Sequence, residues 1–314
     1  MRQQSKFIFI ANPFAMRGKG ARFITRLENE LKQRGIAYTL LTTEHPFHAF
    51  YLAQQAAERE PEATIVAVGG DGTVNEVANA IHNRGPTLGV VPIGSGNDFA
   101  KAIGLTPLDV SAAVETLLAG NEFTIDVGHI AIGYGKEPRV ERLFVNGVGI
   151  GFDGYIAVQT LRYKRLRGWW LYLISLLRSV FVFRTPDMII RLPGKEIHSP
   201  HLLVAIGNGF SSAGKFRLTP KAVLDDGELD ICLVDNVSAV RIFRILPSVF
   251  KGHHDRFPDV HFLRTPKLEV IGARGLYVHA DGEIISRGDI SRFEISAIPH
   301  CLNVIGKALY RPTN

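Results

Sequence analysis

Residues 68–73 read Val-Gly-Gly-Asp-Gly-Thr and form the clearest motif of the chain. The apolar run Thr64–Val68 leads into it, and a segment with helical spacing, Thr73–Ile81, follows it. Glycines let the backbone turn sharply and approach a ligand, and amides at a helix N-terminus suit phosphate oxygens. The stretch therefore predicts a phosphate-binding loop, with a plain strand-to-helix turn capped by Asp71 as the alternative.

The first 120 residues around this loop alternate between strand-like and helix-like segments. Strand-like runs occur at residues 7–11, 36–42, 64–68 and 87–91. Such alternation predicts an α/β domain with a mostly parallel sheet, in which ligands bind at the carboxyl ends of the strands. Two further glycine-bearing loops, residues 12–20 and 92–98, follow strands of the same sheet, so three loops are expected to converge at one edge.

From about Asp126 the pattern changes to β-runs of five to nine residues separated by Gly, Pro and Asp turns. We interpret residues 1–125 as the first domain and residues 126–301 as a second, largely antiparallel β domain. Residues 302–314 are a candidate to return to the first domain. One long helix is expected within the second domain, from Tyr155 to Phe181.

Composition places the chain among ordinary globular proteins. Of its 314 residues, 46% are hydrophobic and 21% charged, and only two are cysteines, which excludes a disulfide framework and a thiolate zinc site. The longest apolar stretch, residues 169–183, is interrupted by Ser175, Arg178 and Ser179 and falls short of the ~20 residues of a membrane helix. We therefore expect a cytoplasmic protein.

The net charge of +6 fits nucleic acid, anionic lipid or phosphorylated ligands alike. Its distribution is more informative, because Arg162, Lys164, Arg165, Arg167 and Arg178 lie in a stretch without acidic residues. Trp169, Trp170 and Tyr172 lie in the same stretch. This combination favours peripheral contact with a membrane, and a core helix with a solvated basic edge is the alternative.

Two acidic turns lie in the second half. Residues 220–230 hold four acidic side chains around Gly227, which suits either a hairpin turn or a site for a hard cation. Residues 279–283 read His-Ala-Asp-Gly-Glu, where Glu283 is a candidate general base for an alcohol. His253 and His254, by contrast, are expected in a solvated loop.

The order of these motifs resembles the diacylglycerol kinase catalytic family, especially its soluble bacterial lipid kinases, with sphingosine kinases as relatives. The resemblance rests on residues 69–73, residues 92–98, the Asp226-Gly227 turn and the Asp281-Gly282-Glu283 turn, and it spans nearly the whole chain. It implies a phosphofructokinase-like N-terminal α/β domain and a C-terminal β-sandwich that supplies the lipid site. The implied reaction transfers the γ-phosphate of ATP to a lipid hydroxyl.

The resemblance also implies roles for individual residues. Glu283 would accept the substrate proton, and Asp71 and Asp98 would belong to the network around the catalytic metal. Mg²⁺ would bind at the Val223 carbonyl, Asp226 and the Glu228 carbonyl. The residues implied to hold ATP are Asn12, Thr43, Gly70, Asp71, Gly72, Thr73, Val74, Asn75, Glu76 and Ser95.

Lys215 departs from the family, which often has a run of glycines at this point. Two other functions stay open: a kinase for a soluble metabolite, of the NAD kinase type, and a nucleotide-binding regulator without turnover. The first does not account for the basic aromatic stretch, and the second needs no base at Glu283. The expected partners are ATP, a lipid substrate and a membrane surface, without nucleic acid, and a homodimer stays open.

Overall fold

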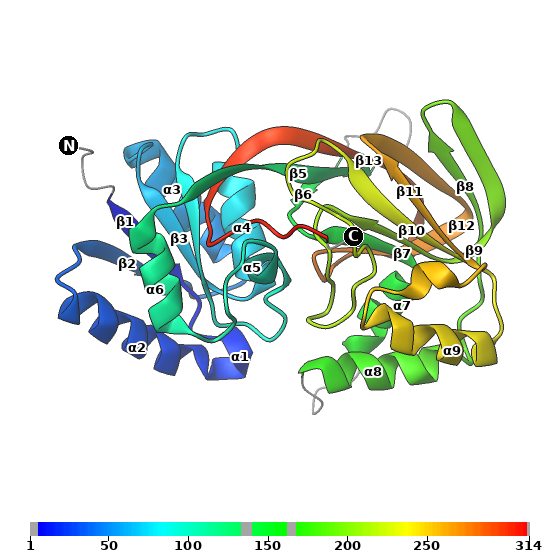
Figure 1. Cartoon of the computed structure of the whole chain (residues 1–314), viewed down its shortest axis with the longest axis horizontal. Coiled ribbons are helices and arrows are strands. Elements are labelled where there is room, and N and C mark those ends of the chain that lie inside the picture. Colours follow the sequence, from blue (N-terminus) through cyan, green and yellow to red (C-terminus); the bar gives the residue numbers. More distant parts are fainter. Residues whose placement is uncertain (1–5, 133–139, 162–167, 313–314) are drawn as a thin grey trace. The chain divides into compact units, whose positions relative to one another are not determined.

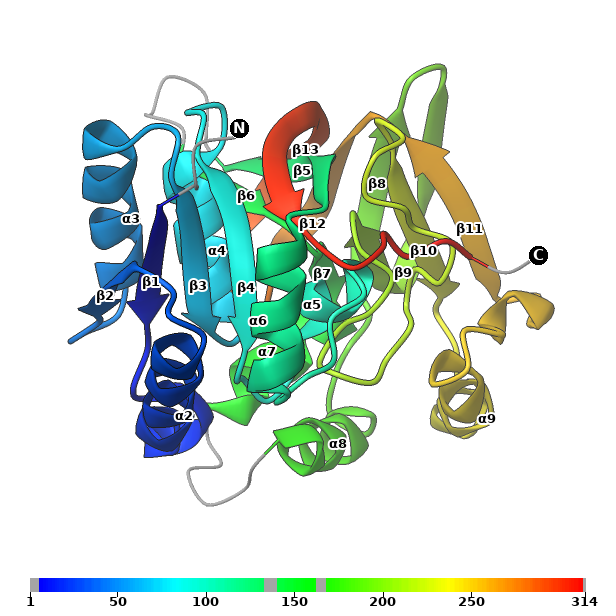
Figure 2. The same cartoon turned by 60° about the vertical axis from the view of Figure 1, so that its left-hand side comes forward.

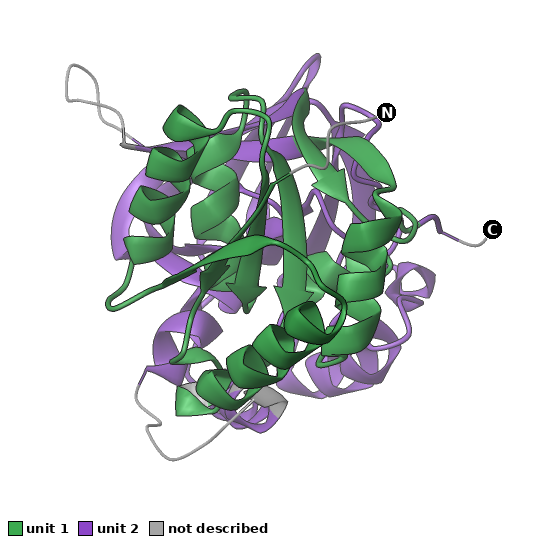
Figure 3. Cartoon of the chain, turned by 90° about the vertical axis from the view of Figure 1, so that its left-hand side faces the viewer, with its two compact units in different colours: residues 1–126, 300–310 green, residues 127–299, 311–314 purple. Residues whose placement is uncertain are grey.

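The computed structural model describes residues 6–132, 140–161 and 168–312 (Figure 1). The chain forms two compact units, coloured separately in Figure 3. The first comprises residues 1–126 and 300–310, and the second residues 127–299 and 311–314. The N-terminal α/β and C-terminal β-rich classes expected from the sequence are both confirmed.

The sheet of the first unit is parallel, as predicted. Its strands run in the order β2 (Tyr38–Thr42), β1 (Phe7–Ala11), β3 (Thr64–Gly69) and β4 (Thr87–Pro92). The end of β13 (Glu283–Ile305) lies parallel to β4, with Val304 opposite Leu88. Every residue of β3 is buried, which explains why its sequence is a continuous apolar run rather than an alternating one.

Helices cover both faces of this sheet (Figure 2). On one face, α2 (Gly20–Gln33) and α6 (Val110–Ala119) bury Leu27, Leu31 and Val114 against the strands. On the other, α3 (His48–Arg59) and α4 (Asp71–Ile81) pack against each other and against β1 and β3. The short helix α1 (Ala15–Gly18) precedes α2.

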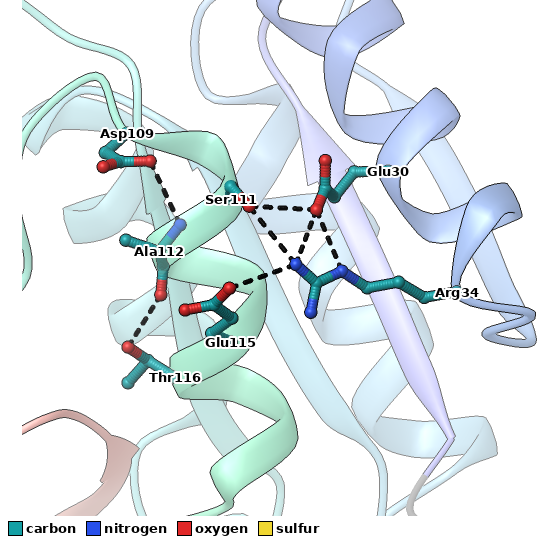
Figure 4. A network of polar contacts seen from close by, with 7 residues as sticks. All are labelled: Glu30, Arg34, Asp109, Ser111, Ala112, Glu115 and Thr116. Atoms are coloured by element: carbon teal, nitrogen blue, oxygen red, sulfur yellow. Dashed lines mark hydrogen bonds and ion pairs between the residues drawn. The ribbon is translucent and has the colours of Figure 1, made fainter.

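A polar network joins α2 to α6 at the surface (Figure 4). Arg34 Nη2 lies 2.7 Å from Glu30 Oε1 and 3.2 Å from Glu115 Oε1, and Ser111 Oγ donates to Glu30 at 2.9 Å. The hydrogen bonds from Arg34 and Ser111 hold the pKa of Glu30 below its usual value. Because these charged groups are partly exposed, their ion pairs contribute little to the free energy of unfolding. Their main effect is to orient the two helices.

The second unit is built from antiparallel strands. After β5 (Glu122–Ile132), which crosses the boundary between the units, they are β6 (Val140–Phe144), β7 (Gly147–Gly151), β8 (Asp187–Leu192), β9 (Lys195–Gly207), β10 (Leu229–Asp235), β11 (Val260–Thr265), β12 (Lys267–Ala280) and β13. The long strands β9 and β12 both pair with β7 and with β8, at separate points along their length. Inward-facing side chains of the strands of this unit, among them Phe144, Val204, Val270 and Phe293, form one buried core.

In the described part of this unit, α7 (Phe152–Thr160), α8 (Gly168–Ser179) and α9 (Ala239–Val249) pack beside this core. The expectation of one helix from Tyr155 to Phe181 was wrong, because α7 and α8 are separate helices that pack against each other. Ile156 of α7 and Leu176 of α8 belong to the same buried cluster. Folding back buries both apolar faces, which a single straight helix would leave apart.

Candidate active site

The glycine loops that follow β3 and β4 touch through their backbones. A Cβ atom on Gly94 would lie 2.3 Å from Gly70 Cα, so Gly94 accepts no side chain unless the loops separate. The loop after β1 joins them, because Asn12 N donates to Val68 O at 2.9 Å and Asn12 Nδ2 to Thr73 Oγ1 at 3.2 Å. The structure thus brings together the three loops singled out in the sequence.

Asp71 links two of these loops. Its Oδ1 accepts the backbone N–H groups of Asp98 at 2.6 Å and Phe99 at 3.3 Å, at the start of α5 (Asp98–Ala102). Asn97, the N-cap of that helix, does not cap it, because its side chain bonds both to the N–H and to the carbonyl of Gly94, each at 2.8 Å. Asp71 therefore performs the capping that would normally fall to the preceding residue.

The other predicted catalytic aspartate of this unit, Asp98, is 5% exposed. Its Oδ1 lies 3.2 Å from Lys101 Nζ, one turn further along α5. The backbone N–H of Asp98 thus donates to the side chain of Asp71, so a substitution at Asp71 removes an acceptor at the start of α5.

Glu76 caps α3 in the way that Asp71 caps α5. Its carboxylate accepts the backbone N–H groups of Phe47 at 3.1 Å and Ala49 at 3.0 Å, where α3 has no side-chain cap of its own. Burial raises the pKa of Glu76, and these hydrogen bonds oppose the rise. Thr43, buried at the end of β2, donates its backbone N–H to Ala11 at 2.9 Å. Glu76 therefore holds the segment that begins at Thr43.

The predicted nucleotide-binding residues fall into an exposed group and a buried group. At the N-terminus of α4, a Cβ atom on Gly72 would meet nothing within 4 Å, and Ser95 in the neighbouring loop is exposed. Val74 and Asn75, in contrast, are 3% and 7% exposed. The Oδ1 of Asn75 accepts a hydrogen bond from Asn79 at 3.0 Å. Gly72 and Ser95 can meet a ligand directly, whereas Val74 and Asn75 support the helix behind them.

In the second unit, the turn that carries Glu283 is held by Asp281. The Asp281 carboxylate accepts three backbone N–H groups, from Val145 at 2.7 Å and from Asn146 and Gly147 at 2.9 Å each. Asp281 itself has a positive φ of 48°, as a tight hairpin turn requires. These bonds fix the turn to the segment between β6 and β7.

Glu283 forms an ion pair with Arg142, whose Nη1 lies 3.0 Å from Glu283 Oε2. About a third of the Glu283 side chain is exposed. Sequence reasoning missed Arg142, because a basic residue in a β-run carries no pattern of its own.

A buried pair lies next to this turn. His279 Nε2 is 2.9 Å from Asp153 Oδ2, and both side chains are more than nine-tenths buried. Burial opposes a charge on His279, but the facing carboxylate outweighs it and raises the pKa of His279. A Cβ atom on Gly149 would lie 2.4 Å from His279 Nε2 and 2.2 Å from Asp153 Oδ2. Gly149 thus leaves the room for the pair, but a single glycine in a β-run carries no pattern that would have revealed the pair from the sequence.

The acidic turn predicted to bind Mg²⁺ already contains a cation. Arg264 Nη2 forms an ion pair with Asp226 Oδ2 and lies 3.2 Å from Glu228 Oε2, and Arg264 Nε lies 3.5 Å from Asp230 Oδ2. Burial raises the pKa of Asp230 to about 6, although Arg264 opposes the rise. Mg²⁺ at Val223, Asp226 and Glu228 would therefore compete with Arg264 for the Asp226 carboxylate.

Within the described ranges, no group of three or more His, Cys, Asp or Glu side chains is arranged to hold a metal ion. The Oδ1 atom of Asp226 accepts the Glu228 N–H at 3.1 Å. Lys215, where the sequence departs from the glycine-rich pattern, is exposed in a tight turn whose preceding residues, Ala213 and Gly214, have positive φ.

An apolar pocket opens in the second unit among α7, α8, α9 and strands β9 and β10, with about 630 Å³ of space between protein atoms, part of it open to solvent. Phe152, Leu176 and Ile242 are among the apolar side chains that line it. The pocket also contains two buried polar residues, Asp153 and His254. The expectation of a solvated loop was wrong for His254, which is 1% exposed.

Both halves of the chain match known family models. Residues 6–130 match the diacylglycerol kinase catalytic domain, and residues 146–306 match the YegS C-terminal NAD kinase beta sandwich-like domain. Among curated proteins, a diacylglycerol kinase of Mycobacterium tuberculosis is 29% identical over 301 residues, covering 96% of this chain and 94% of that protein. A diacylglycerol kinase of Staphylococcus saprophyticus is 26% identical over 286 residues, with 90% of each chain covered.

Solved structures agree on the fold. A diacylglycerol kinase from Bacillus anthracis superposes with a TM-score of 0.70 at 20% identity and covers 98% of each chain. Yeast NADH kinase superposes with a TM-score of 0.53 at 11% identity and covers 98% of this chain and 84% of that one. Among the described residues, no helix is long and apolar enough to cross a membrane.

Proposed function

Since this chain belongs to the diacylglycerol kinase catalytic domain family and carries a YegS-type C-terminal domain, we propose that it is a lipid kinase. The reaction would transfer the γ-phosphate of ATP to a hydroxyl group of a diacylglycerol-like or sphingoid lipid. As the lipid oxygen bonds to phosphorus, the bond from phosphorus to the ADP oxygen breaks and the hydroxyl proton goes to a carboxylate.

The observation that carries this proposal is the apolar pocket of the second unit. Its lining is almost wholly hydrocarbon, from residues such as Phe152, Leu176, Leu203 and Val249. A kinase for a soluble nucleotide such as NAD needs polar partners for its substrate, whereas an acyl or alkyl chain is matched by such a lining. The pocket therefore favours a lipid over the soluble metabolite suggested by the likeness to NADH kinase.

For ATP, we propose the glycine loops of the first unit. The backbone amides at the N-terminus of α4 are suited to phosphate oxygens, and the open space at Gly72 leaves room for them. Asn12, Gly70 and Ser95 would complete the loop surface, and Thr73, which is 5% exposed and accepts a hydrogen bond from Asn12, would support it from within. Thr43, Val74, Asn75 and Glu76 would act from behind it, since they are buried or engaged with the backbone.

Phosphoryl transfer is catalysed mainly by positioning and charge neutralisation. Mg²⁺, when bound with ATP, supplies part of that neutralisation, and Asp71 and Asp98 are the carboxylates proposed to stand in its water network. Glu283 is proposed to accept the hydroxyl proton, and Arg142, whose Nη1 lies 3.0 Å from Glu283 Oε2, would hold that carboxylate in place. The acidic turn is proposed as a structural Mg²⁺ site in which the ion replaces Arg264 at Asp226.

Contact with a membrane would deliver the substrate to the pocket. Exposed apolar side chains gather on α8, just after it, and on α9: Trp170, Leu177, Phe181, Val182, Val240 and Phe243. The rings of Phe181 and Phe243 lie 6.2 Å apart, and Arg178 and Arg244 are exposed on the same two helices. Such a surface suits anionic lipid headgroups with apolar side chains inserted between them. Residues 162–167, where the sequence placed most of the basic charge, lie outside the described residues.

Replacing both Phe181 and Phe243 with serine should therefore weaken co-sedimentation with anionic vesicles by about tenfold, while activity on detergent-dispersed lipid persists. Tyr51→Ser, at an exposed aromatic residue of α3, is the matched control. Vesicle binding that is unchanged in the double variant would show that another surface contacts the membrane.

Transfer of labelled phosphate from ATP tests the function itself. The acceptors are diacylglycerol, sphingosine, monoacylglycerol and NAD, each presented with Mg²⁺. We expect a labelled lipid product and no labelled NAD. Labelling of NAD alone would support the soluble-metabolite alternative, and the absence of any labelled product with intact ATP binding would support a regulator.

A further inference from the structure

His254 occupies an unusual position in the apolar pocket. It begins the short 3-10 helix His254–Arg256, is 1% exposed, and lies beside the ring of Phe262, with 5.0 Å between the ring centroids. Its Nε2 is 3.1 Å from the backbone carbonyl oxygen of Leu218. Because a carbonyl can only accept a hydrogen bond, Nε2 must carry the proton of this contact.

The other ring nitrogen, Nδ1, is therefore a bare acceptor when the ring is neutral. Burial lowers the pKa of His254, which favours the neutral ring, although the bond to Leu218 opposes this effect. Among the described residues, Nδ1 has no hydrogen-bond partner and almost no contact with solvent. Leaving such an acceptor unpaired costs a factor of about 5 to 150 in an equilibrium constant.

Among the described residues that line the pocket, none lies within hydrogen-bond distance of Nδ1, the thiol of Cys232 included. Leu218, Phe216 and Val249 offer hydrocarbon, and Asp153 is engaged with His279. A plain hydrocarbon chain that fills the pocket would leave Nδ1 unpaired, whereas a chain with a hydroxyl at the right depth would satisfy it.

We propose that His254 Nδ1 accepts a hydrogen bond from a hydroxyl group on the hydrocarbon chain of the ligand, and so selects for a hydroxylated chain. This inference rests on the proposed function of the pocket as a lipid site. Glu283 does not line the pocket, so this hydroxyl differs from the one that would be phosphorylated. His254 is then a specificity-determining residue rather than a catalytic one.

Binding to the full chain without ATP tests the proposal. The ligands are monoacylglycerols with a 12-carbon acyl chain, either plain or with one hydroxyl at successive chain positions, which displace a fluorescent fatty-chain probe. We expect at least one hydroxylated isomer to bind wild type about tenfold more tightly than the plain chain. His254→Phe should lose this preference, because it removes the acceptor and keeps an aromatic ring.

His254→Gln should keep the preference, since its amide can donate to Leu218 O and accept from the ligand at the same time. His253→Phe, at the exposed neighbouring histidine, is the matched control and should behave as wild type. Equal affinity of wild type for the plain chain and every hydroxylated isomer would overturn the proposal, even if His254→Phe does not fold. So would a preference that survives in folded His254→Phe.

These outcomes are separate from those of the kinase proposal. A protein that prefers a hydroxylated chain but transfers no phosphate would contradict the lipid kinase and leave the role of His254 intact. A protein that phosphorylates lipids without any such preference would support the lipid kinase and contradict the role of His254.

Discussion

Substitutions at Asp71 can separate its role in the fold from its proposed role in phosphoryl transfer. Its carboxylate caps α5 through the N–H groups of Asp98 and Phe99. Asp71→Ala removes the only side-chain acceptor described for these two groups, whereas Asp71→Asn retains an oxygen in the same place. The two variants should therefore differ in stability while sharing the loss of charge.

The size of the stability difference follows from the geometry. Loss of an N-cap acceptor costs about 0.5–2 kcal/mol of unfolding free energy, and bonds to a charged, partly buried acceptor lie at the upper end of that range. We expect Asp71→Ala to lose about 2 kcal/mol and Asp71→Asn less than about 1 kcal/mol. Urea unfolding followed by circular dichroism measures both values.

The loss of activity in the two Asp71 variants should not parallel their loss of stability. If the charge of Asp71 acts on the phosphates, both variants should lose about 10²–10³-fold in kcat, since removal of one preorganised electrostatic contact has effects of this size. Asp109→Ala is the matched control, because Asp109 caps α6 by accepting the Ala112 N–H at 3.1 Å. It should lose similar stability without loss of activity.

Two results would refute this reasoning. Asp71→Ala that unfolds at the same urea concentration as wild type would show that the cap contributes nothing in solution. Asp71→Asn that keeps wild-type kcat would show that the charge is not needed for transfer, and that any loss in Asp71→Ala comes from the displaced α5.

Three further predictions concern the second unit. Glu283→Gln should lower kcat by about 10²–10⁴-fold if Glu283 is the general base, and a loss below tenfold with chemistry rate-limiting would assign it another role. Asp226→Ala should lower the melting temperature and abolish stabilisation by Mg²⁺, whereas Arg264→Met should strengthen the stabilisation by Mg²⁺. An equal Mg²⁺ response in both variants and wild type would place the ion elsewhere. Because the folded pKa of His279 is raised above 6.5, the stability it contributes is present below that pH and lost as the pH rises through the raised value. The difference in unfolding free energy between wild type and His279→Gln should therefore shrink from pH 5.5 to pH 8.5, and a constant difference would contradict the pair with Asp153.

The α/β unit could be predicted from the sequence because its signals are local. A buried strand such as Thr64–Gly69 is visible as a continuous apolar run, and the glycines at 69, 70 and 72 mark a turn into a helix wherever they occur. Parallel strands separated by helices then bring the loops to one edge by topology alone. The convergence of the loops needed no knowledge of any individual side-chain contact.

The partners of the charged residues could not be predicted in this way. Asp71 caps a helix that begins 27 residues later, and Asp153 pairs with His279 across 126 residues of sequence. Asp71 also has a local interpretation as a helix cap, and the residues next to Asp71 and Asp153 do not indicate a distant partner. Such pairs form only when packing brings separate strands and helices together.

The environments of the acidic turn and of the apolar pocket also depend on tertiary contacts that the sequence does not reveal. The residues around Asp226 indicated a cation, but only the antiparallel pairing of β10 with β11 places Arg264 opposite Asp230 and so supplies that cation from the chain itself. His254 reads as one of several loop histidines, and its burial depends on the strands and helices that enclose it. Local sequence determines backbone conformation through short-range sterics and periodicity, whereas the ionisation and hydrogen bonding of a side chain depend on neighbours that the tertiary fold selects.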